Sequence, residues 1–299
     1  MHSKKSFLTR DSQILNQDSL STRLMGKFGW GLIYAIMIIW AFTSLINTGW
    51  ITMSSLKTNQ ELFANIWAPP EHLQWSNYVI AWQHSHMDRY FLNSLMVSGV
   101  TVIATALISA MASYIFARYT FPGNRLLLIL FIAGMAIPLQ LIMVPIYLMF
   151  NRLHLINSLP GLIMMYITTC LPFSIFVLTG FFRTLPKELE EAAILDGASE
   201  YQVFWLVMLP LASPGLYTIS IFNFLGVWNE YLFALFLLND PAKMTIPVGL
   251  YNLRNTMGAT ANWTSMFAGL IIILVPTLIF FLIFQNRIIG GLTAGALKG

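Results

Sequence analysis

The stretch that decides the fold is residues 91–117, FLNSLMVSGVTVIATALISAMASYIFA, which contains no charged residue. A helix needs about 20 mostly apolar residues to cross the hydrocarbon core of a bilayer, and this run is long enough. In lipid, the backbone N–H and C=O groups must be paired within the protein, which a single helix achieves. Residues 91–117 therefore predict a membrane-spanning α-helix.

The composition of the whole chain agrees with this prediction. Of the 299 residues, 57% are hydrophobic and 14% aromatic. Only 9% are charged, whereas a soluble domain carries roughly 25% charged residues. So few charges cannot solvate the surface of a soluble fold of this length. The composition therefore excludes a soluble enzyme, a disordered chain and a fibre.

Five further stretches are long and apolar enough to cross a membrane. The first follows a polar segment and is too long for the apolar part of a signal peptide, about 7–15 residues, so we expect it to remain as an uncleaved helix. The sequence thus predicts an all-α, polytopic membrane protein with six transmembrane helices, at residues 28–46, 91–117, 126–150, 159–182, 216–238 and 266–284.

The distribution of Lys and Arg predicts the orientation. If the N-terminus is cytoplasmic, eleven of the 16 cations fall on the cytoplasmic side, as the positive-inside rule requires. Both the N- and C-termini are then cytoplasmic. The expected parts are a cytoplasmic tail at 1–27, the first helix at 28–46, an extracytoplasmic loop at 47–90, a five-helix core at 91–284 with a cytoplasmic loop at 183–215, and a cytoplasmic tail at 285–299.

The cytoplasmic loop 183–215 is rich in acidic residues, among them Glu188, Glu191 and Asp196. Negative charge in a first turn stabilises a helix N-terminus, and a preceding proline suits the same place. Gly197 fits the left-handed position that ends a helix. The sequence therefore predicts a short acidic helix that ends in a glycine bend.

A second helix is expected after the bend, capped by Ser199 and reaching Leu209 before the helix-breaking Pro210. One interpretation places the first helix on lipid headgroups, but such helices usually carry Lys or Arg on the polar face. Docking into a groove of another protein suits an acidic helix better, because Ala192 and Ala193 would allow close approach.

The spacing of these residues resembles the signature of ABC importer permeases. That signature is Glu-Ala-Ala, three residues, Gly, nine residues, Ile or Val, one residue and Leu-Pro, and here it is matched by Glu191-Ala192-Ala193, Gly197 and Val-Met-Leu-Pro at 207–210. Three further segments are similar to the carbohydrate branch of the maltose-transporter type: FLNSL at 91–95, WNEY at 228–231 and the C-terminal 292–299. The resemblance covers about residues 28–299.

The resemblance implies the transmembrane fold of type I ABC importers and a permease subunit of a sugar importer in a bacterial or archaeal cytoplasmic membrane. In this family, a second permease subunit completes the pathway, two ATPase subunits bind beneath, and an extracytoplasmic solute-binding protein delivers the sugar. The ATPase-coupling residues that it implies are Glu188, Glu191, Ala192, Ala193, Asp196, Gly197, Leu209 and Pro210. A permease for a polyol or a glycerol phosphate ester is the alternative substrate assignment.

No catalytic residue, metal or cofactor is expected on this chain. It lacks the Gly-x4-Gly-Lys-Ser/Thr phosphate loop, so ATP and Mg are expected on separate ATPase subunits. His84, His86 and Asp88 are too few ligands for a metal site. The single cysteine, Cys170, is interpreted as a small buried hydrophobe. The expected surroundings are the lipid bilayer and the sugar, with no nucleic acid.

Glu230 is the one acidic residue inside a predicted span, where a charge is costly and marks a site by default. Asn223, Gly226 and Glu230 are three and four residues apart, so they share one face of a continuous helix. Either Asn223 and Glu230 line the pathway and bond sugar hydroxyls, or Glu230 pairs with donors where helices pack. Arg254 and the second subunit are its candidate partners.

Gln140 lies between two prolines, Pro138 and Pro145, in the third predicted span. Prolines kink helices and free backbone carbonyls, so this segment is either a cavity wall or a packing kink. We therefore take Gln140 as a third candidate residue of the pathway.

A six-span membrane enzyme or ion channel is the alternative from a different class. An intramembrane enzyme should show several His, Asp or Glu residues in its spans, and only Glu230 is available. A channel should show a filter or charged rings, and the sequence has neither. The acidic loop helix has no task in either class.

Overall fold

The computed structural model describes residues 4–84, 86–252 and 262–296. The described residues form helices and connecting turns, without a strand, as the sequence predicts. The helices include α1 (Lys4–Ser55), α2 (Asn59–Ala64), α3 (Ser76–Val79), η1 (Ile80–His84), α4 (Met87–Arg118), α5 (Asn124–Gly134), η2 (Leu139–Ile142), α6 (Met143–Arg152), α7 (Leu159–Thr184), α8 (Glu188–Leu195), α9 (Glu200–Gln202), η3 (Val203–Met208), α10 (Leu209–Leu211), α11 (Ser213–Trp228), α12 (Leu232–Leu237), η4 (Pro241–Lys243) and α14 (Trp263–Ala296). Residues 246–252 are helical as well.

Four helices are long and apolar enough to cross a membrane unbroken, at Gly29–Ser55, Met87–Arg118, Leu159–Thr184 and Trp263–Phe284. Two bent pairs raise the number to six if each pair is counted as one span. Asn124–Gly134 and Leu139–Arg152 meet at 93°, and Glu200–Leu211 and Ser213–Trp228 meet at 70°. The predicted polytopic, all-helical fold is confirmed, with spans of two kinds.

Two of the predicted spans are wrong as continuous helices. The third, 126–150, breaks after Gly134 because Pro138 has no N–H to donate and holds the chain before it out of the helical region. In the fifth, 216–238, the helix ends at Trp228, and three residues separate it from the start of α12 at Leu232. Both breaks lie inside apolar sequence, where composition gives no sign of them.

The helices at both ends of the chain are longer than their predicted spans. The predicted tail at 1–27 continues from Lys4 into α1, and the predicted tail at 285–299 continues α14 to Ala296. The predicted loop at 47–90 contains the end of α1 and three short helices, and α4 begins within it at Met87. The helical stretches therefore extend beyond the apolar ones.

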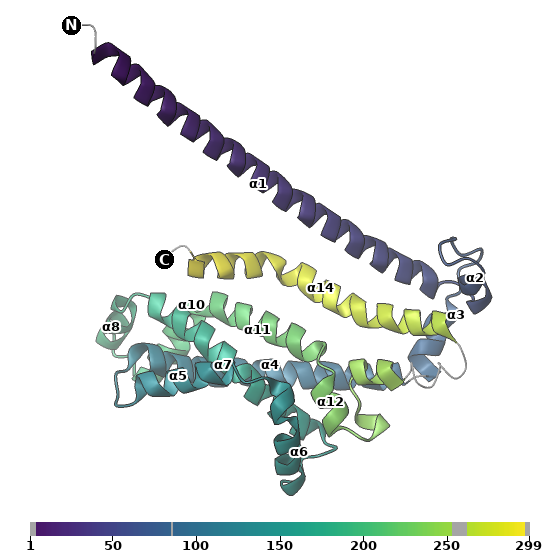
Figure 1. Ribbon diagram of the computed structural model, residues 1–299. Coiled ribbons are helices and arrows are strands. Elements are labelled where there is room, and N and C mark those ends of the chain that lie inside the picture. Colours follow the sequence, from purple (N-terminus) through teal and green to yellow (C-terminus); the bar gives the residue numbers. More distant parts are fainter. Residues whose placement is uncertain (1–3, 85, 253–261, 297–299) are drawn as a thin grey trace.

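α4 and α7 form the centre of the bundle, with α11 and α14 beside them (Figure 1). The contact face of α4 carries small hydroxyl residues, which let helix backbones approach closely in a membrane. Ser113 Oγ donates a hydrogen bond to the Ile175 carbonyl of α7 at 3.1 Å. The buried hydroxyl residues of α4 are Ser94, Ser98, Thr101, Thr105, Ser109 and Ser113.

α1 extends away from the bundle and packs beside α14 (Figure 1). Its contact with α14 includes the Trp50 and Phe267 rings, whose centroids are 5.3 Å apart in an edge-to-face arrangement. The large apolar side chains of α1 from Trp30 to Ile46 are exposed. In a membrane these side chains would contact lipid or another subunit.

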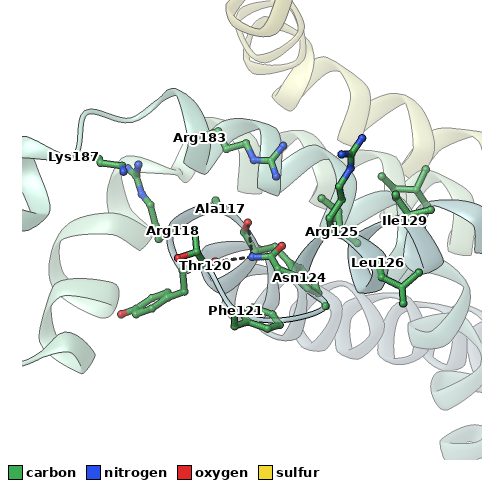
Figure 2. Close-up of a pocket in the computed structure, with 15 residues that line it drawn as sticks. Ala117, Arg118, Thr120, Phe121, Asn124, Arg125, Leu126, Ile129, Arg183 and Lys187 are labelled. Carbon is green, nitrogen blue, oxygen red and sulfur yellow. Dashed lines mark hydrogen bonds between the residues drawn. The ribbon is translucent and has the colours of Figure 1, made fainter.

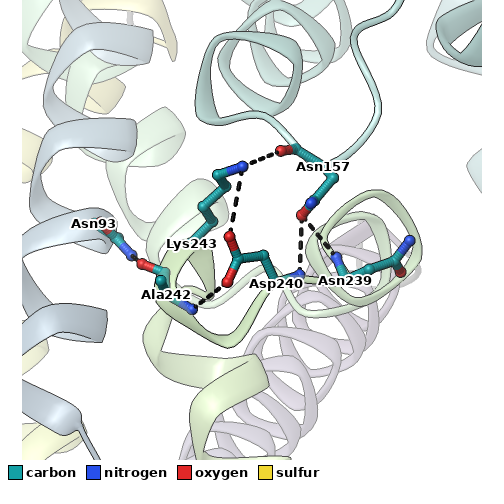
Figure 3. Close-up of polar contacts among 6 residues, drawn as sticks. All are labelled: Asn93, Asn157, Asn239, Asp240, Ala242 and Lys243. Atoms are coloured by element: carbon teal, nitrogen blue, oxygen red, sulfur yellow. Dashed lines mark hydrogen bonds and ion pairs between the residues drawn. The ribbon is translucent and has the colours of Figure 1, made fainter.

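The loops at the end of the bundle opposite α8 are held by a polar network (Figure 3). Asn157, in the left-handed region at φ 55°, accepts the backbone N–H groups of Asn239 and Asp240 at 3.1 and 2.9 Å. Lys243 Nζ donates to the Asn157 carbonyl at 2.9 Å. Asn93 Nδ2 donates to the carbonyls of Ala242 and Met244, which joins these loops to α4.

Candidate coupling helix and transport pathway

The predicted acidic helix exists as α8, and its ends follow from its residues. Glu188, Glu190 and Glu191 occupy the first turn, where their charges complement the helix dipole. Gly197 has φ +88°, the left-handed region that glycine adopts without strain. Its N–H donates to the Ile194 carbonyl at 2.9 Å, and the next residue donates to the Ala193 carbonyl at 3.0 Å, as in a Schellman cap.

The second helix of the loop also begins where the sequence predicts. Ser199 Oγ accepts the Gln202 N–H at 3.4 Å, and Gln202 Oε1 accepts the Ser199 N–H at 2.8 Å. The helix then widens into a π-helical turn, in which the Leu209 N–H donates to the Phe204 carbonyl. Pro210 has no N–H to continue the α-helical register, which suits a wider turn before it.

An ion pair that sequence reasoning missed ties α8 to the bundle. Arg118, the last residue of α4, places its Nε 2.6 Å from Glu190 Oε1, and the two side chains are only 5% and 17% exposed. Arg118 Nη2 also donates to the Leu185 carbonyl, just beyond the end of α7, at 2.8 Å. One side chain thus joins α4, the end of α7 and α8.

The sequence carried a signal for this pair, because Arg118 directly follows the predicted span 91–117 and the loop 183–215 on the same side is acidic. Burial raises the pKa of the adjacent Tyr119 phenol above its ordinary value. Tyr119 therefore stays neutral beside the acidic loop at physiological pH. The positive charge available to Glu190 within the described contacts comes from Arg118.

The outer surface of α8 combines carboxylates with exposed apolar side chains. Leu195 is 87% exposed, Ile194 54% and Leu189 38%. Ala193 is partly buried and packs inward against a cluster of buried residues that includes Phe182 and Met208. Exposed leucines beside carboxylates suit a protein groove better than water or a bilayer of anionic lipid.

Glu230 lies at the break between α11 and α12 and accepts three hydrogen bonds. The Tyr166 hydroxyl of α7 donates to Oε2 at 2.6 Å. The backbone N–H groups of Phe233 and Ala234 donate at 2.9 and 3.2 Å, so Glu230 caps α12. These contacts favour the packing interpretation over the pathway interpretation. Arg254, the expected partner, lies outside the described residues.

Asn223 and Glu230 do not share one helix face as predicted, because α11 ends at Trp228. Asn223 is buried between helices, where its Nδ2 donates to Ser174 Oγ of α7 at 2.9 Å. Gly226 is exposed instead. The structure therefore joins both polar candidates to α7, at two separate places.

Gln140 lies in η2, at the break of the third span, and its side chain is exposed. A cavity of about 450 Å³ opens beside this break, between the α5–α6 segment and α7. Ile137, Leu139 and Pro172 are among its lining residues, whereas Gln140 is not. The cavity wall at this kink is thus mainly apolar among the described residues.

The bundle and its surface helix define a membrane permease of the importer type. Residues 103–289 match the family described as binding-protein-dependent transport system inner membrane components, and the chain belongs to this family.

Two relatives cover most of the chain. It is 36% identical over 265 residues to the diacetylchitobiose uptake system permease protein NgcG of Streptomyces coelicolor, which covers 89% of this chain and 88% of the relative. It is 34% identical over 270 residues to the trehalose transport system permease protein SugB of Mycobacterium tuberculosis, which covers 90% and 97%.

The fold is similar to a solved structure of a bacterial ABC transporter involved in the import of the acidic polysaccharide alginate. The TM-score is 0.73 at 23% sequence identity, and the match covers 86% of this chain and 95% of the other. The predicted ABC importer fold is thereby confirmed.

Proposed function

We propose that this chain is the permease subunit of an ATP-driven importer for a sugar in a bacterial cytoplasmic membrane. The observation that carries the proposal is the 36% identity to a diacetylchitobiose uptake permease across most of both chains. The similarity to a trehalose permease supports a sugar over a polyol or a glycerol phosphate ester. A solute-binding protein would deliver the sugar at the end of the bundle opposite α8.

In this proposal, α8 is the coupling helix, and two ATPase subunits with bound ATP and Mg dock on it. Its exposed apolar and acidic surface fits a groove with basic residues at the rim. The Arg118 ion pair and the inward packing of Ala193 make α8 move with α4 and α7. Movement of the ATPases would then rock the helices around the pathway, as in other alternating-access transporters.

The pathway would form between this chain and a second permease subunit. The break in the third span and the cavity beside it offer a bundle surface that such a subunit could complete. Glu230 and Asn223 would act on this surface indirectly, because their hydrogen bonds to Tyr166 and Ser174 hold α12 and α11 against α7. Gln140 remains the candidate whose side chain is exposed at the break.

The experiment is uptake of labelled sugars by cells that contain the complete importer. We expect uptake of a disaccharide from a panel that also holds a polyol and glycerol phosphate, and loss of uptake in Glu191→Arg and Gly197→Pro. Glu71→Arg is the matched control, because it makes the same charge change at an exposed position far from α8. Unaltered ATPase assembly and uptake in both α8 variants would refute the coupling assignment.

A further inference from the structure

A large pocket lies beside α8, and apart from Arg118 its residues have no part in the proposed transport mechanism. It has a volume of about 1010 Å³ and lies between the end of α4, the turn that follows, the first turns of α5 and the end of α7 (Figure 2). Four cations line it: Arg118, Arg125, Arg183 and Lys187. None of the residues that line it is acidic.

Three of the four cations have no anionic partner among the described residues. Arg118 pairs with Glu190, whereas Arg125, Arg183 and Lys187 take part in no ion pair within the described part of the chain. All three are exposed. Three unpaired positive charges around one pocket repel one another unless an anion occupies it, so the pocket is complementary to a negative group.

The backbone adds to this positive potential. α5 starts at Asn124 after Gly123, whose φ of +88° turns the chain and which offers no side chain to cap the helix. The Asn124 N–H donates to the Phe121 carbonyl at 3.1 Å, but no side chain caps the helix. The N–H groups that follow Asn124 and the helix dipole both favour an anion at this position. Asn124 instead directs its Nδ2 toward the Tyr119 carbonyl, at 2.6 Å (Figure 2).

The other wall of the pocket is apolar and faces outward. It includes Leu126, 62% exposed, and Ile129, 50% exposed, on α5, and Ile132 one turn further along. These residues belong to a bent pair of helices that is apolar enough to span the membrane. A soluble partner cannot follow this wall into the bilayer, whereas an acyl chain can.

In the topology predicted from the sequence, the pocket would lie at the level of the cytoplasmic bilayer surface. The spans of α4 and α7 end at Arg118 and Thr184, and α5 begins at Asn124, so three helix ends meet there. Basic pockets between helix ends at the cytoplasmic surface are suited to anionic lipid headgroups. We propose that this pocket binds the phosphate headgroup of an anionic membrane phospholipid, with an acyl chain along Leu126, Ile129 and Ile132.

The lipid would sit against the segment that moves in transport. Arg183 and Lys187 flank the linker between α7 and α8, and Arg118 joins the pocket to Glu190 of α8. An anionic headgroup would hold this linker to the membrane surface. Membrane charge would thereby influence α8 without any contact with the sugar pathway.

The test is lipid retention by the purified complete importer, with phosphatidylglycerol as the probe and phosphatidylcholine as the uncharged reference. Native mass spectrometry would count bound lipids in the unaltered protein and in Arg125→Gln/Arg183→Gln/Lys187→Gln. We expect affinity to fall about fivefold for each cation removed, hence roughly 100-fold for all three. Arg89→Gln/Arg152→Gln is the matched control, with exposed arginines at the opposite end, and should retain the lipid.

Further measurements distinguish a lipid in this pocket from free phosphate and from a protein partner. Inorganic phosphate at millimolar concentration should not displace the lipid, and its full competition would show a free-phosphate site instead. If the triple variant keeps the lipid but loses its ATPase subunits, the pocket is a protein-docking surface and the proposal is wrong. Equal lipid loss in the control pair would also overturn it. An unchanged melting temperature of the triple variant shows that the protein is folded.

Discussion

The Arg118–Glu190 pair should determine how firmly α8 is attached to the bundle. In Glu190→Leu, the Arg118 charge stays in a site where its side chain is 5% exposed, without a counterion. Breaking a buried ion pair by removal of one partner costs about 3–5 kcal/mol. We take the lower end, because the Glu190 side chain is 17% exposed. At about 1.4 kcal/mol per factor of ten, about 3 kcal/mol makes local opening of α8 roughly 150-fold more frequent.

The assay is hydrogen exchange of the backbone amides at 187–202 in the purified complex. Exchange in Glu190→Leu should accelerate by up to that factor, while the middle of α4 stays protected. Arg118→Met should have a similar effect and also lose the hydrogen bond to the Leu185 carbonyl. The double variant Arg118→Met/Glu190→Leu should recover most of the protection, because an apolar pair leaves no charge buried.

Two results would refute this reasoning. Exchange in Glu190→Leu could equal that of the unaltered protein, which would show that the pair does not hold α8. Alternatively, the double variant could exchange as fast as the single variants, which would show that lost packing rather than a stranded charge opens the helix. Glu71→Leu, an exposed acid in a distant loop, is the control and should change nothing.

Three other variants test separate contacts. Gly197→Ala should lower the melting temperature, because the left-handed backbone conformation costs about 1–2 kcal/mol for a residue with a Cβ. Gly197→Asn should lower the melting temperature less, and equal melting temperatures of the two variants would contradict a left-handed cap at residue 197. Glu230→Ala should lower the free energy of unfolding in denaturant by about 1–3 kcal/mol, because two N–H groups of α12 lose their acceptor. Unchanged stability together with impaired uptake would instead favour a role of Glu230 in the sugar pathway. Asn157→Ala should destabilise the loops opposite α8, whereas Asn157→Asp should not, because Asp can still accept both backbone hydrogen bonds. The measurement is the rate of proteolysis of these loops, and equal rates in the two variants would show that the Asn157 side chain does not stabilise them.

The spans that were predicted correctly are those whose helical structure follows from an uninterrupted apolar stretch of the chain. α4 and α7 are uninterrupted apolar runs, and their helices extend a few residues beyond the predicted ends. The bend of the cytoplasmic loop also has a local cause. Gly197 adopts the left-handed conformation, and the Ser199 side chain caps the helix that follows it. Short-range chemistry of this kind is readable from sequence.

The features that were missed depend on residues far apart in the chain. The break at Glu230 is stabilised by Tyr166 on another helix, and the attachment of α8 depends on Arg118 on a third. Apolar composition cannot distinguish a straight span from a bent one, because lipid-facing residues continue on both sides of Pro138. The roles of the coupling residues and of Gln140 stay predictions for the same reason, since they depend on partner subunits.

Cross-linking of α8 to the ATPase tests the central proposal most directly. In a Cys170→Ser background, which removes the one native cysteine, Leu195→Cys places a thiol at a position that is 87% exposed. Leu73→Cys, at a position 57% exposed at the opposite end of the bundle, is the control. We predict that a thiol-to-amine cross-linker joins the Leu195→Cys protein, and not the Leu73→Cys protein, to the ATPase subunit. Cross-linking through position 73 instead, or none through 195 in a complex that still imports sugar, would contradict α8 as the coupling helix.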